Sequence, residues 1–222
     1  TMAHIALAGG SECGHGPSGA PLGACQLGSD TDGGVCKTTD GGANWSLSKS
    51  NLANLNARSI LALPPATVLV GTSSGLARST NATANWKSIG IGGAYAVNSL
   101  VAEPANPAVL YAGISSGVIK STNAGASWVN LSKGLTNHFV RSVAVDPVTP
   151  QTIYAGTAGG IFKSLNGATN WSPVNNGLGL GASNLNVNVV VARPAVLYAG
   201  TTHGLFTSVD GAANGVVATN GL

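Results

Sequence analysis

Charged residues are scarce in this chain of 222 residues, which carries ten Lys and Arg and seven Asp and Glu, 8% of the total. Aromatic residues contribute only 5%. Ten basic side chains are too few for a surface that follows the phosphates of a nucleic acid, so we expect no nucleic-acid partner. The net charge of +3 allows at most a weak attraction to acidic polymers.

Long hydrophobic runs are also missing. No apolar stretch approaches the roughly 18 residues that a membrane helix needs, so we expect no membrane span. No window combines a sustained helical period with capping residues, so the sequence predicts essentially no helix.

The chain instead repeats one twelve-residue phrase five times. The copies begin 41, 42, 43 and 44 residues apart. A period in the forties indicates a supersecondary module that needs its neighbours to complete a core. The copies are GVCKTTDGGANW from Gly34, GLARSTNATANW from Gly75, GVIKSTNAGASW from Gly117, GIFKSLNGATNW from Gly160 and GLFTSVDGAANG from Gly204.

Each unit contains four short apolar segments separated by Gly, Asn, Ser and Pro. The first ends at a proline, as in RSVAVDP from Arg141, and the second resembles TIYAG from Thr152. The third opens the repeated phrase and the fourth follows its tryptophan. Val, Ile, Leu and Tyr dominate these segments, which predicts four strands per unit. They are apolar on both faces, as is typical of sheets covered on both sides.

These features predict an all-β fold, a β-propeller of about five four-stranded antiparallel blades, either a closed five-bladed ring or part of a larger propeller. A β-solenoid is the alternative, although solenoid coils are usually shorter and lack a repeated hairpin tryptophan. We expect one domain, 1–222, with blades at about 4–49 (with an insertion at 11–33), 57–91, 97–133, 139–177 and 186–222.

The repeated phrase resembles the Asp-box, Ser/Thr-x-Asp/Asn-x-Gly-x-Ser/Thr-Trp. The first copy fits it well with Thr38, Asp40, Gly42 and Trp45. The chain is therefore similar to the Asp-box (BNR-type) propellers of sortilin-type receptors, photosystem II assembly factors and xyloglucan-degrading glycoside hydrolases. The same blade serves receptors, scaffolds and enzymes, so this resemblance implies a fold rather than a function.

The later copies depart from the pattern, since Thr83 and Ala168 replace the glycine and Gly215 stands in place of the fifth tryptophan. The residues at the aspartate and tryptophan positions are Asp40, Asn81, Asn123, Asn166, Asp210, Trp45, Trp86, Trp128 and Trp171.

The short polar side chain of each copy is predicted to accept backbone N–H groups in a hairpin. Asp40 and Asp210 are therefore interpreted as turn formers rather than catalytic acids. The tryptophan is predicted to cover the hairpin and to pack between blades. Trp128→Ala is then expected to lower the free energy of unfolding by about 3 to 5 kcal/mol.

The segment 11–33 breaks the repeat. Cys13 and Cys25 flank an irregular Gly- and Pro-containing loop, so we predict a disulfide between them, which implies an oxidising compartment. Cys25 with Cys36 is the alternative pairing, although Cys36 takes a strand position that is apolar in the other units. Asp30 and Asp32 in SDTDGG resemble half of a calcium loop but lack the distal Glu, so a turn is favoured over a metal site. No cofactor is expected.

Strand direction sorts the remaining residues between two faces. If each inner strand starts at the top, the repeated hairpins lie at the bottom. The top face then carries one equivalent polar position per inner strand, and fold analogy places ligands there or in the central channel. The candidate ligand-binding residues are Arg58, Asn98, Arg141, Asn188, His138, His203 and Tyr95. The alternative is that this polar ring only hydrates the channel and bonds to backbone.

Catalytic groups are poorly represented. A glycosidase needs two carboxylates about 5 to 9.5 Å apart on rigid elements. The acidic residues outside the repeated positions all lie in 11–33. A sialidase needs an arginine cluster, and only Arg58 and Arg141 are expected at the top. The sequence therefore leans against an enzyme.

In the first unit, HIALAGG from His4 aligns with the second strand of the other units, so no innermost strand precedes it. One sheet edge is therefore predicted to be unpaired. Open edges pair with other chains, so we expect a protein partner or self-association through that edge, with carbohydrate as a further candidate. Together these features predict a secreted, extracellular or periplasmic, non-enzymatic propeller for binding or assembly that uses its top face and central channel. The alternative is a lectin-like carbohydrate-binding module or a fragment of a glycoside hydrolase propeller.

Overall fold

The computed structural model describes residues 5–8, 34–40, 42–178 and 185–218. Every regular element in these ranges is a β-strand, which confirms the predicted all-β class. Nowhere in them is there a helix able to cross a membrane.

Several residues singled out in the sequence lie outside the described ranges. Cys13, Cys25, Asp30 and Asp32 are among them, so the disulfide and the weak metal candidate stay predictions. Cys36 is described, and it is buried in a strand.

The chain divides into two compact units, Thr1–Val97 and Asn98–Leu222. Unit 1 holds a three-stranded sheet followed by a four-stranded sheet, each with its strands in chain order. The three-stranded sheet begins with the strand that aligns with the second strand of the other units, as the sequence predicts. The strands are β1 (Ile5–Ala8), β2 (Gly34–Lys37), β3 (Ser46–Ser48), β4 (Ala57–Leu63), β5 (Thr67–Thr72), β6 (Gly75–Ser79) and β7 (Lys87–Ile89).

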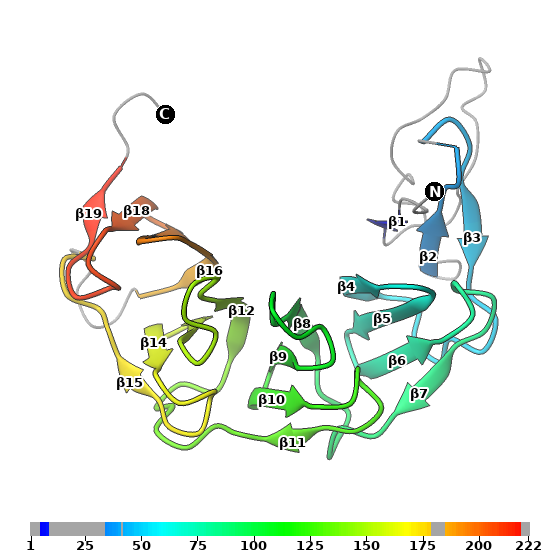
Figure 1. Ribbon diagram of the computed structural model, residues 1–222, viewed down its shortest axis with the longest axis horizontal. Coiled ribbons are helices and arrows are strands. Elements are labelled where there is room, and N and C mark those ends of the chain that lie inside the picture. The colour runs from blue at the N-terminus through cyan, green and yellow to red at the C-terminus, as the bar shows by residue number, and fades with distance from the viewer. Residues whose placement is uncertain (1–4, 9–33, 41, 179–184, 219–222) are drawn as a thin grey trace. The chain divides into compact units, whose positions relative to one another are not determined.

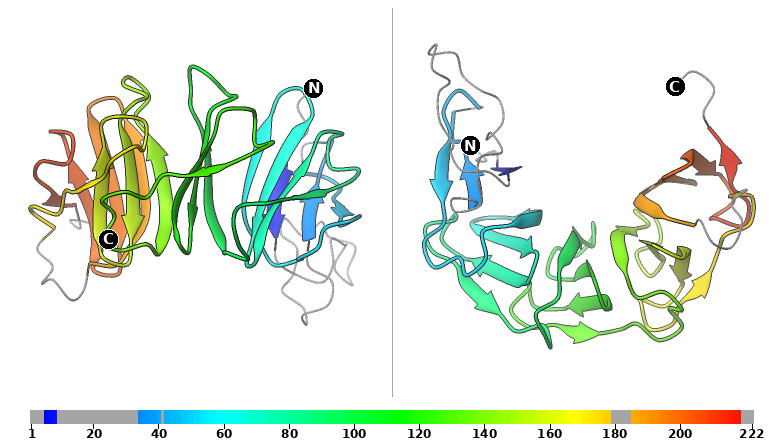
Figure 2. Two further views of the ribbon diagram at one scale, coloured as in Figure 1. Left: turned by 90° about the horizontal axis from the view of Figure 1, so that it is seen from below. Right: turned by 180° about the vertical axis from the view of Figure 1, so that it is seen from behind.

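Unit 2 holds three four-stranded antiparallel sheets, again in chain order (Figure 1). Figure 2, left, shows the strands of each sheet running up and down beside one another. Their strands are β8 (Val97–Ala102), β9 (Leu110–Ile114), β10 (Gly117–Ser121), β11 (Val129–Asn130), β12 (Val140–Val145), β13 (Ile153–Thr157), β14 (Gly160–Ser164), β15 (Ser172–Pro173), β16 (Val187–Arg193), β17 (Val196–Thr201), β18 (Gly204–Ser208) and β19 (Val216–Val217).

Consecutive sheets of unit 2 share apolar cores. One core joins Tyr111 and Val118 of the β8–β11 sheet to Val143, Phe162 and other residues of the next sheet. A second core joins Tyr154 and Ile161 of that sheet to Val190, Phe206 and other residues of the β16–β19 sheet. The middle sheet of unit 2 therefore buries both of its faces, because a neighbouring sheet lies against each.

A serine at the third position of β4, β8 and β12 bonds to the backbone of the next inner strand. Ser59 Oγ donates to the carbonyl of Val97 at 3.0 Å. Ser99 Oγ accepts the N–H of Val143 at 3.1 Å. Ser142 Oγ accepts the N–H of Val190 at 3.1 Å. These side chains replace part of the backbone pairing that strands of separate sheets cannot make.

The five repeated hairpins share one hydrogen-bond pattern. In each, the Asp or Asn oxygen accepts the backbone N–H four residues later at 2.9–3.0 Å. The preceding Ser or Thr hydroxyl accepts a second N–H at 2.9–3.0 Å. The interpretation of Asp40 and Asp210 as turn formers agrees with this geometry.

Candidate ligand site at the start of the inner strands

The predicted polar positions all fall on the second residue of an inner strand. In three strands that residue is the extra residue of a β-bulge, with the register shifting between Ala57 and Ser59, Val140 and Ser142, and Val187 and Val189. A bulge bends the strand and redirects the side chain of its extra residue, and bulges are common beside functional sites. The bulged residues are Arg58, Arg141 and Asn188.

Arg141 reaches from β12 to residues at the start of the next inner strand. Its guanidinium donates to Asn188 Oδ1 at 2.5 Å and to Asn186 Oδ1 at 3.4 Å. The carbon at its centre lies 5.5 Å from the ring centroid of Phe139, within the range of a cation–π contact. Two neighbouring inner strands and one aromatic ring therefore hold the guanidinium in place.

The positive charge of Arg141 is only partly satisfied by these contacts. Both acceptors are neutral amides, and Nε is buried without a hydrogen-bond partner among the described residues. A guanidinium bonds most strongly to a carboxylate or another anion, often with two parallel hydrogen bonds. The arrangement can therefore receive an acidic group from outside.

Phe139 and Asn186 are members of this site that the sequence analysis missed. They occupy equivalent places, two residues before Arg141 and Asn188. Phe139 is 42% exposed, which is unusual for so large an apolar side chain in a chain with few aromatics.

The other predicted residues are placed as follows. Asn98 Nδ2 donates to the carbonyl of Val140 at 2.8 Å, a bond to backbone of the kind that the alternative interpretation expected. His138 is exposed beside Phe139. His203 lies in the turn after β17, where its N–H donates to Thr201 Oγ1 at 3.0 Å.

Arg58 and Tyr95 belong to unit 1 and are described only within it. Arg58 is exposed at the bulge of β4, and Tyr95 is half-buried in the loop before β8.

Unit 1 also contains a surface cavity, which lies by the link after β5 and the end of β7. It encloses about 190 Å³, and its lining includes Asn54, Ser74, Leu76, Ile89 and Ile91. No charged side chain is among its lining residues, so we assign no chemistry to it.

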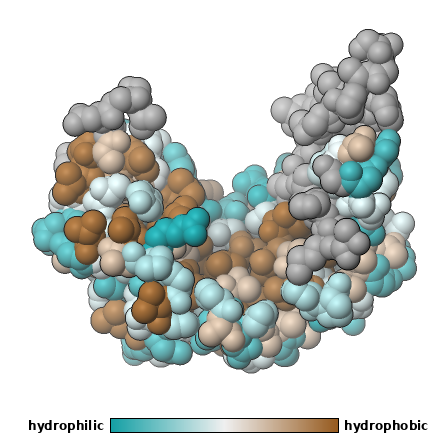
Figure 3. Space-filling model, turned by 45° about the horizontal axis from the view of Figure 1, so that its top comes forward, coloured by the Kyte–Doolittle hydropathy of each residue, from teal (hydrophilic) through white to brown (hydrophobic). Residues whose placement is uncertain are grey.

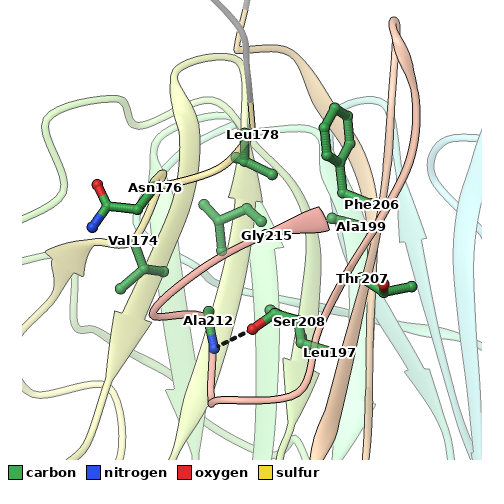
Figure 4. Close-up of a pocket in the computed structure, with 11 residues that line it drawn as sticks. Val174, Asn176, Leu178, Leu197, Ala199, Phe206, Thr207, Ser208, Ala212 and Gly215 are labelled. Carbon is green, nitrogen blue, oxygen red and sulfur yellow. Dashed lines mark hydrogen bonds between the residues drawn. The ribbon is translucent and has the colours of Figure 1, made fainter. Parts of the chain in front are cut away.

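A smaller cavity lies between the last two sheets (Figure 4). Gly215 stands there among Val174, Leu178 and Leu197. The N–H of Gly215 bonds to Asn176 O at 2.8 Å, the counterpart of the bond from Trp171 N to Lys133 O one sheet earlier. The cavity therefore marks the place of the missing fifth tryptophan. Its space admits about one water molecule, too little for a ligand.

The carboxylates of the hairpins are unsuited to acid catalysis. Bonds from the N–H and side-chain amide of Asn44 and from the Thr38 hydroxyl lower the pKa of Asp40 from 3.8 to about 2. The Ser208 hydroxyl, followed by the N–H of Asn214, lowers the pKa of Asp210 as well. Across the described part of the chain, no three His, Cys, Asp or Glu side chains gather as metal ligands would.

No protein family model and no curated protein matches this sequence. Solved structures do match it. An ancestral GH74 enzyme is 24% identical with a TM-score of 0.74, over 85% of this chain and 28% of the enzyme. The extracellular domain of the putative one-component system BT4673 from B. thetaiotaomicron is 17% identical with a TM-score of 0.65, over 79% of this chain and 25% of that domain.

A third match is YCF48 bound to a D1 peptide, which is 20% identical with a TM-score of 0.57, over 84% of this chain and 60% of YCF48. The chain thus spans about a quarter to three fifths of the length of these three proteins. Identities below 25% establish the fold alone, and that fold is the β-propeller, as predicted.

Proposed function

We propose that this chain is a secreted, non-enzymatic binding or assembly module that holds an acidic segment of a protein partner at Arg141. The observation that carries the proposal is the guanidinium of Arg141, fixed by Asn186, Asn188 and Phe139 and bonded to neutral amides only. A fixed, incompletely satisfied guanidinium loses little conformational freedom when a carboxylate binds.

The comparisons support binding in general terms. YCF48 is a propeller that binds a peptide, and BT4673 contributes an extracellular domain, which is compatible with a secreted module. We further propose that the five hairpins are Asp-boxes, since all five repeat the same pair of side-chain to backbone hydrogen bonds.

A peptide array tests this function, with each acidic peptide accompanied by a twin that carries Gln or Asn in place of Glu or Asp. We expect the protein to prefer the acidic member of a pair. Arg141→Ala should weaken that binding about tenfold or more, because a charge-assisted hydrogen bond is lost. Its melting temperature should stay within a degree or two, since Arg141 is half-buried and is not part of the apolar cores.

Arg193→Ala is the matched control, because Arg193 is an exposed arginine at the other end of β16. It should bind as the unmodified protein does. Arg58→Ala tests the equivalent position of unit 1 in the same assay. Equal binding of acidic peptides and their neutral twins, or an unaffected Arg141→Ala variant, would contradict the proposal.

A carbohydrate ligand is the second candidate. The 42% exposed ring of Phe139 lies beside amide groups, and an apolar ring next to hydrogen-bonding side chains suits a sugar. A glycan array decides between the two. Glycan binding that Phe139→Ala abolishes, without any preference for acidic peptides, would favour carbohydrate.

A further inference from the structure

Asparagine is followed directly by glycine at four places in the chain. The described pairs are Asn166–Gly167, Asn176–Gly177 and Asn214–Gly215, while Asn220–Gly221 lies outside the described ranges. Such a pair is reactive, because glycine has no side chain to keep its backbone nitrogen from attacking the asparagine amide. Asparagine is accordingly one of the heat-labile residues. The three described pairs share this chemistry and differ in their surroundings.

In Asn166–Gly167 both reacting groups are already hydrogen-bonded. The side-chain oxygen of Asn166 accepts the hydroxyl of Ser164 at 3.0 Å and the N–H of Asn170 at 2.9 Å. The N–H of Gly167 donates to the carbonyl of Gln151 at 2.9 Å. The amide must turn toward the glycine nitrogen to react, so these bonds have to open first.

Asn214–Gly215 is held in a similar way. The side-chain nitrogen of Asn214 donates to Oδ2 of Asp210 at 2.9 Å. The N–H of Gly215 donates to the carbonyl of Asn176 at 2.8 Å. Like the first pair, this one belongs to a repeated hairpin, whose hydrogen bonds fix both the amide and the glycine nitrogen.

Asn176–Gly177 lies outside the hairpins, in the link between β15 and β16. Among the described residues, neither the side-chain amide of Asn176 nor the N–H of Gly177 has a hydrogen-bond partner. Figure 4 shows the amide of Asn176 pointing away from the other labelled residues. Asn166, Asn176 and Asn214 are all exposed, so hydrogen bonding, and not access to solvent, distinguishes the three.

The exposure of Asn176 belongs to its place in the repeat. Lys133 takes the same place one sheet earlier, where its carbonyl accepts the N–H of Trp171 at 3.0 Å. Ser50 does so in unit 1, with the N–H of Trp86 at 3.1 Å. Both Lys133 and Ser50 are exposed. Lys133 stays exposed in a junction that a further sheet follows, so the exposure of this place does not depend on which sheet comes next.

We propose that Asn176 deamidates spontaneously in the folded protein, while the other two described pairs resist the reaction. The nitrogen of Gly177 attacks Cγ of Asn176, and a bond forms between them. The bond from Cγ to Nδ2 breaks, and Nδ2 leaves as ammonia with the proton of the glycine N–H. Water then opens the resulting succinimide ring at either of its carbonyls. One opening gives aspartate, and the other gives isoaspartate, in which the chain continues through the former side-chain carbon.

The reaction falls on a contact that holds the last sheet. The carbonyl of Asn176 accepts the N–H of Gly215, which stands in place of the fifth tryptophan. A Cβ added at Gly177 would meet the carbonyl oxygen of Gly215, so the two backbones lie in close contact. Isoaspartate lengthens the chain here and turns the accepting carbonyl into a free carboxylate. The bond to Gly215 is therefore displaced.

The outer strand of the last sheet buries little apolar surface of its own. β19 has two residues, Val216 and Val217, which are 65% and 52% exposed. Val129, at the equivalent place in β11, is also 65% exposed. Figure 3 shows hydrophobic residues at the surface of unit 2, which is drawn at the left. A strand of this kind depends on nearby backbone bonds, so deamidation of Asn176 should loosen the last sheet.

Peptide mapping by mass spectrometry tests the site, after storage of the whole protein at body temperature and mildly alkaline pH. We expect Asn176 to deamidate about tenfold faster or more than Asn166 and Asn214, since hydrogen bonds must open before either of these reacts. In protein kept unfolded in guanidinium chloride, the three should react at similar rates, because only the folded structure separates them.

Asn176→Gln is the matched variant, because glutamine keeps the amide but has to close a larger ring, which forms far more slowly. Its melting temperature should stay constant during storage, while that of the unmodified protein falls as isoaspartate accumulates. Equal rates at the three sites of the folded protein overturn the inference. So does an Asn176 that stays intact when folded but reacts when unfolded. A constant melting temperature despite conversion of Asn176 would overturn the loosening of the last sheet.

Discussion

At the scale of single residues, each repeated hairpin depends on one short polar side chain. Asp40 and Asp210 accept backbone N–H groups as carboxylates, whereas Asn123 does the same as a neutral amide. The hairpins also demand a positive φ that glycine adopts readily. Thr83, Ala168 and Ala212 keep φ values of 74°, 72° and 70° at the glycine position, so these three turns carry backbone strain.

Because two of the hairpins depend on an aspartate, we expect the stability of the protein to fall in acid. The folded-state pKa of Asp40 is about 2, below its ordinary value of 3.8, and that of Asp210 is lowered as well. Their contribution to the free energy of unfolding is therefore complete above about pH 4 and is lost as the pH falls toward 2.

Chemical unfolding between pH 2 and pH 5 measures this effect. The double variant Asp40→Asn with Asp210→Asn should lose less stability across that window than the unmodified protein, because an amide keeps its hydrogen bonds at every pH. Asp146→Asn serves as a control at a carboxylate outside the hairpins. Acid profiles that coincide for the double variant and the unmodified protein would show that the two hairpin carboxylates do not govern the effect.

At the scale of elements, the tryptophans after the hairpins divide into two kinds. Trp171 is 4% exposed, and its indole donates to the carbonyl of Leu131 in the preceding sheet at 2.8 Å. Trp86 likewise donates to Ser48. Trp128 is half-buried and bonds instead to Gly125 of its own hairpin. The predicted packing between sheets therefore holds for Trp86 and Trp171.

Replacement of Trp171, rather than of Trp128, is therefore expected to lower the free energy of unfolding the most. Trp171→Ala should lower the free energy of unfolding by about 3 to 5 kcal/mol, because it empties the core between two sheets. Trp128→Ala should cost about half as much or less, since more of its ring is already exposed. Denaturant unfolding of the two variants under the same conditions gives both values. Equal losses, or a larger one for Trp128, would contradict the assignment.

At the scale of the whole molecule, the two units differ in how complete their sheets are. Unit 2 has three four-stranded sheets with a closed core at each of the two junctions between them. The first sheet of unit 1 has three strands, and residues 9–33 within it are not described. Repeat proteins need about three stacked units for stability, a number that unit 2 reaches alone.

We therefore expect the fragment 97–222 to fold by itself. Its circular dichroism should show β-structure, and its thermal unfolding should be one cooperative transition. The fragment 1–97, with one complete sheet, is the comparison and should be much less stable. A fragment 97–222 without a cooperative transition would show that unit 2 depends on unit 1.

Alignment of the repeat units predicted several residues of the candidate site. Arg141 and Asn188 share one register position, and the structure bonds them to each other. The bulges that redirect these side chains could not be predicted, because a bulge depends on how an inner strand pairs with its neighbour. Phe139 was missed because nothing local distinguishes an aromatic that stacks on an arginine from one that enters a core.

The sequence by itself determined the four-stranded units and their hairpins, because apolar periodicity and turn residues act within about forty residues of chain. Only the tertiary structure decided which faces are covered. Val189 and Tyr198 fit the repeat as well as any strand residue, yet they are exposed, since burial depends on whether another sheet lies against them.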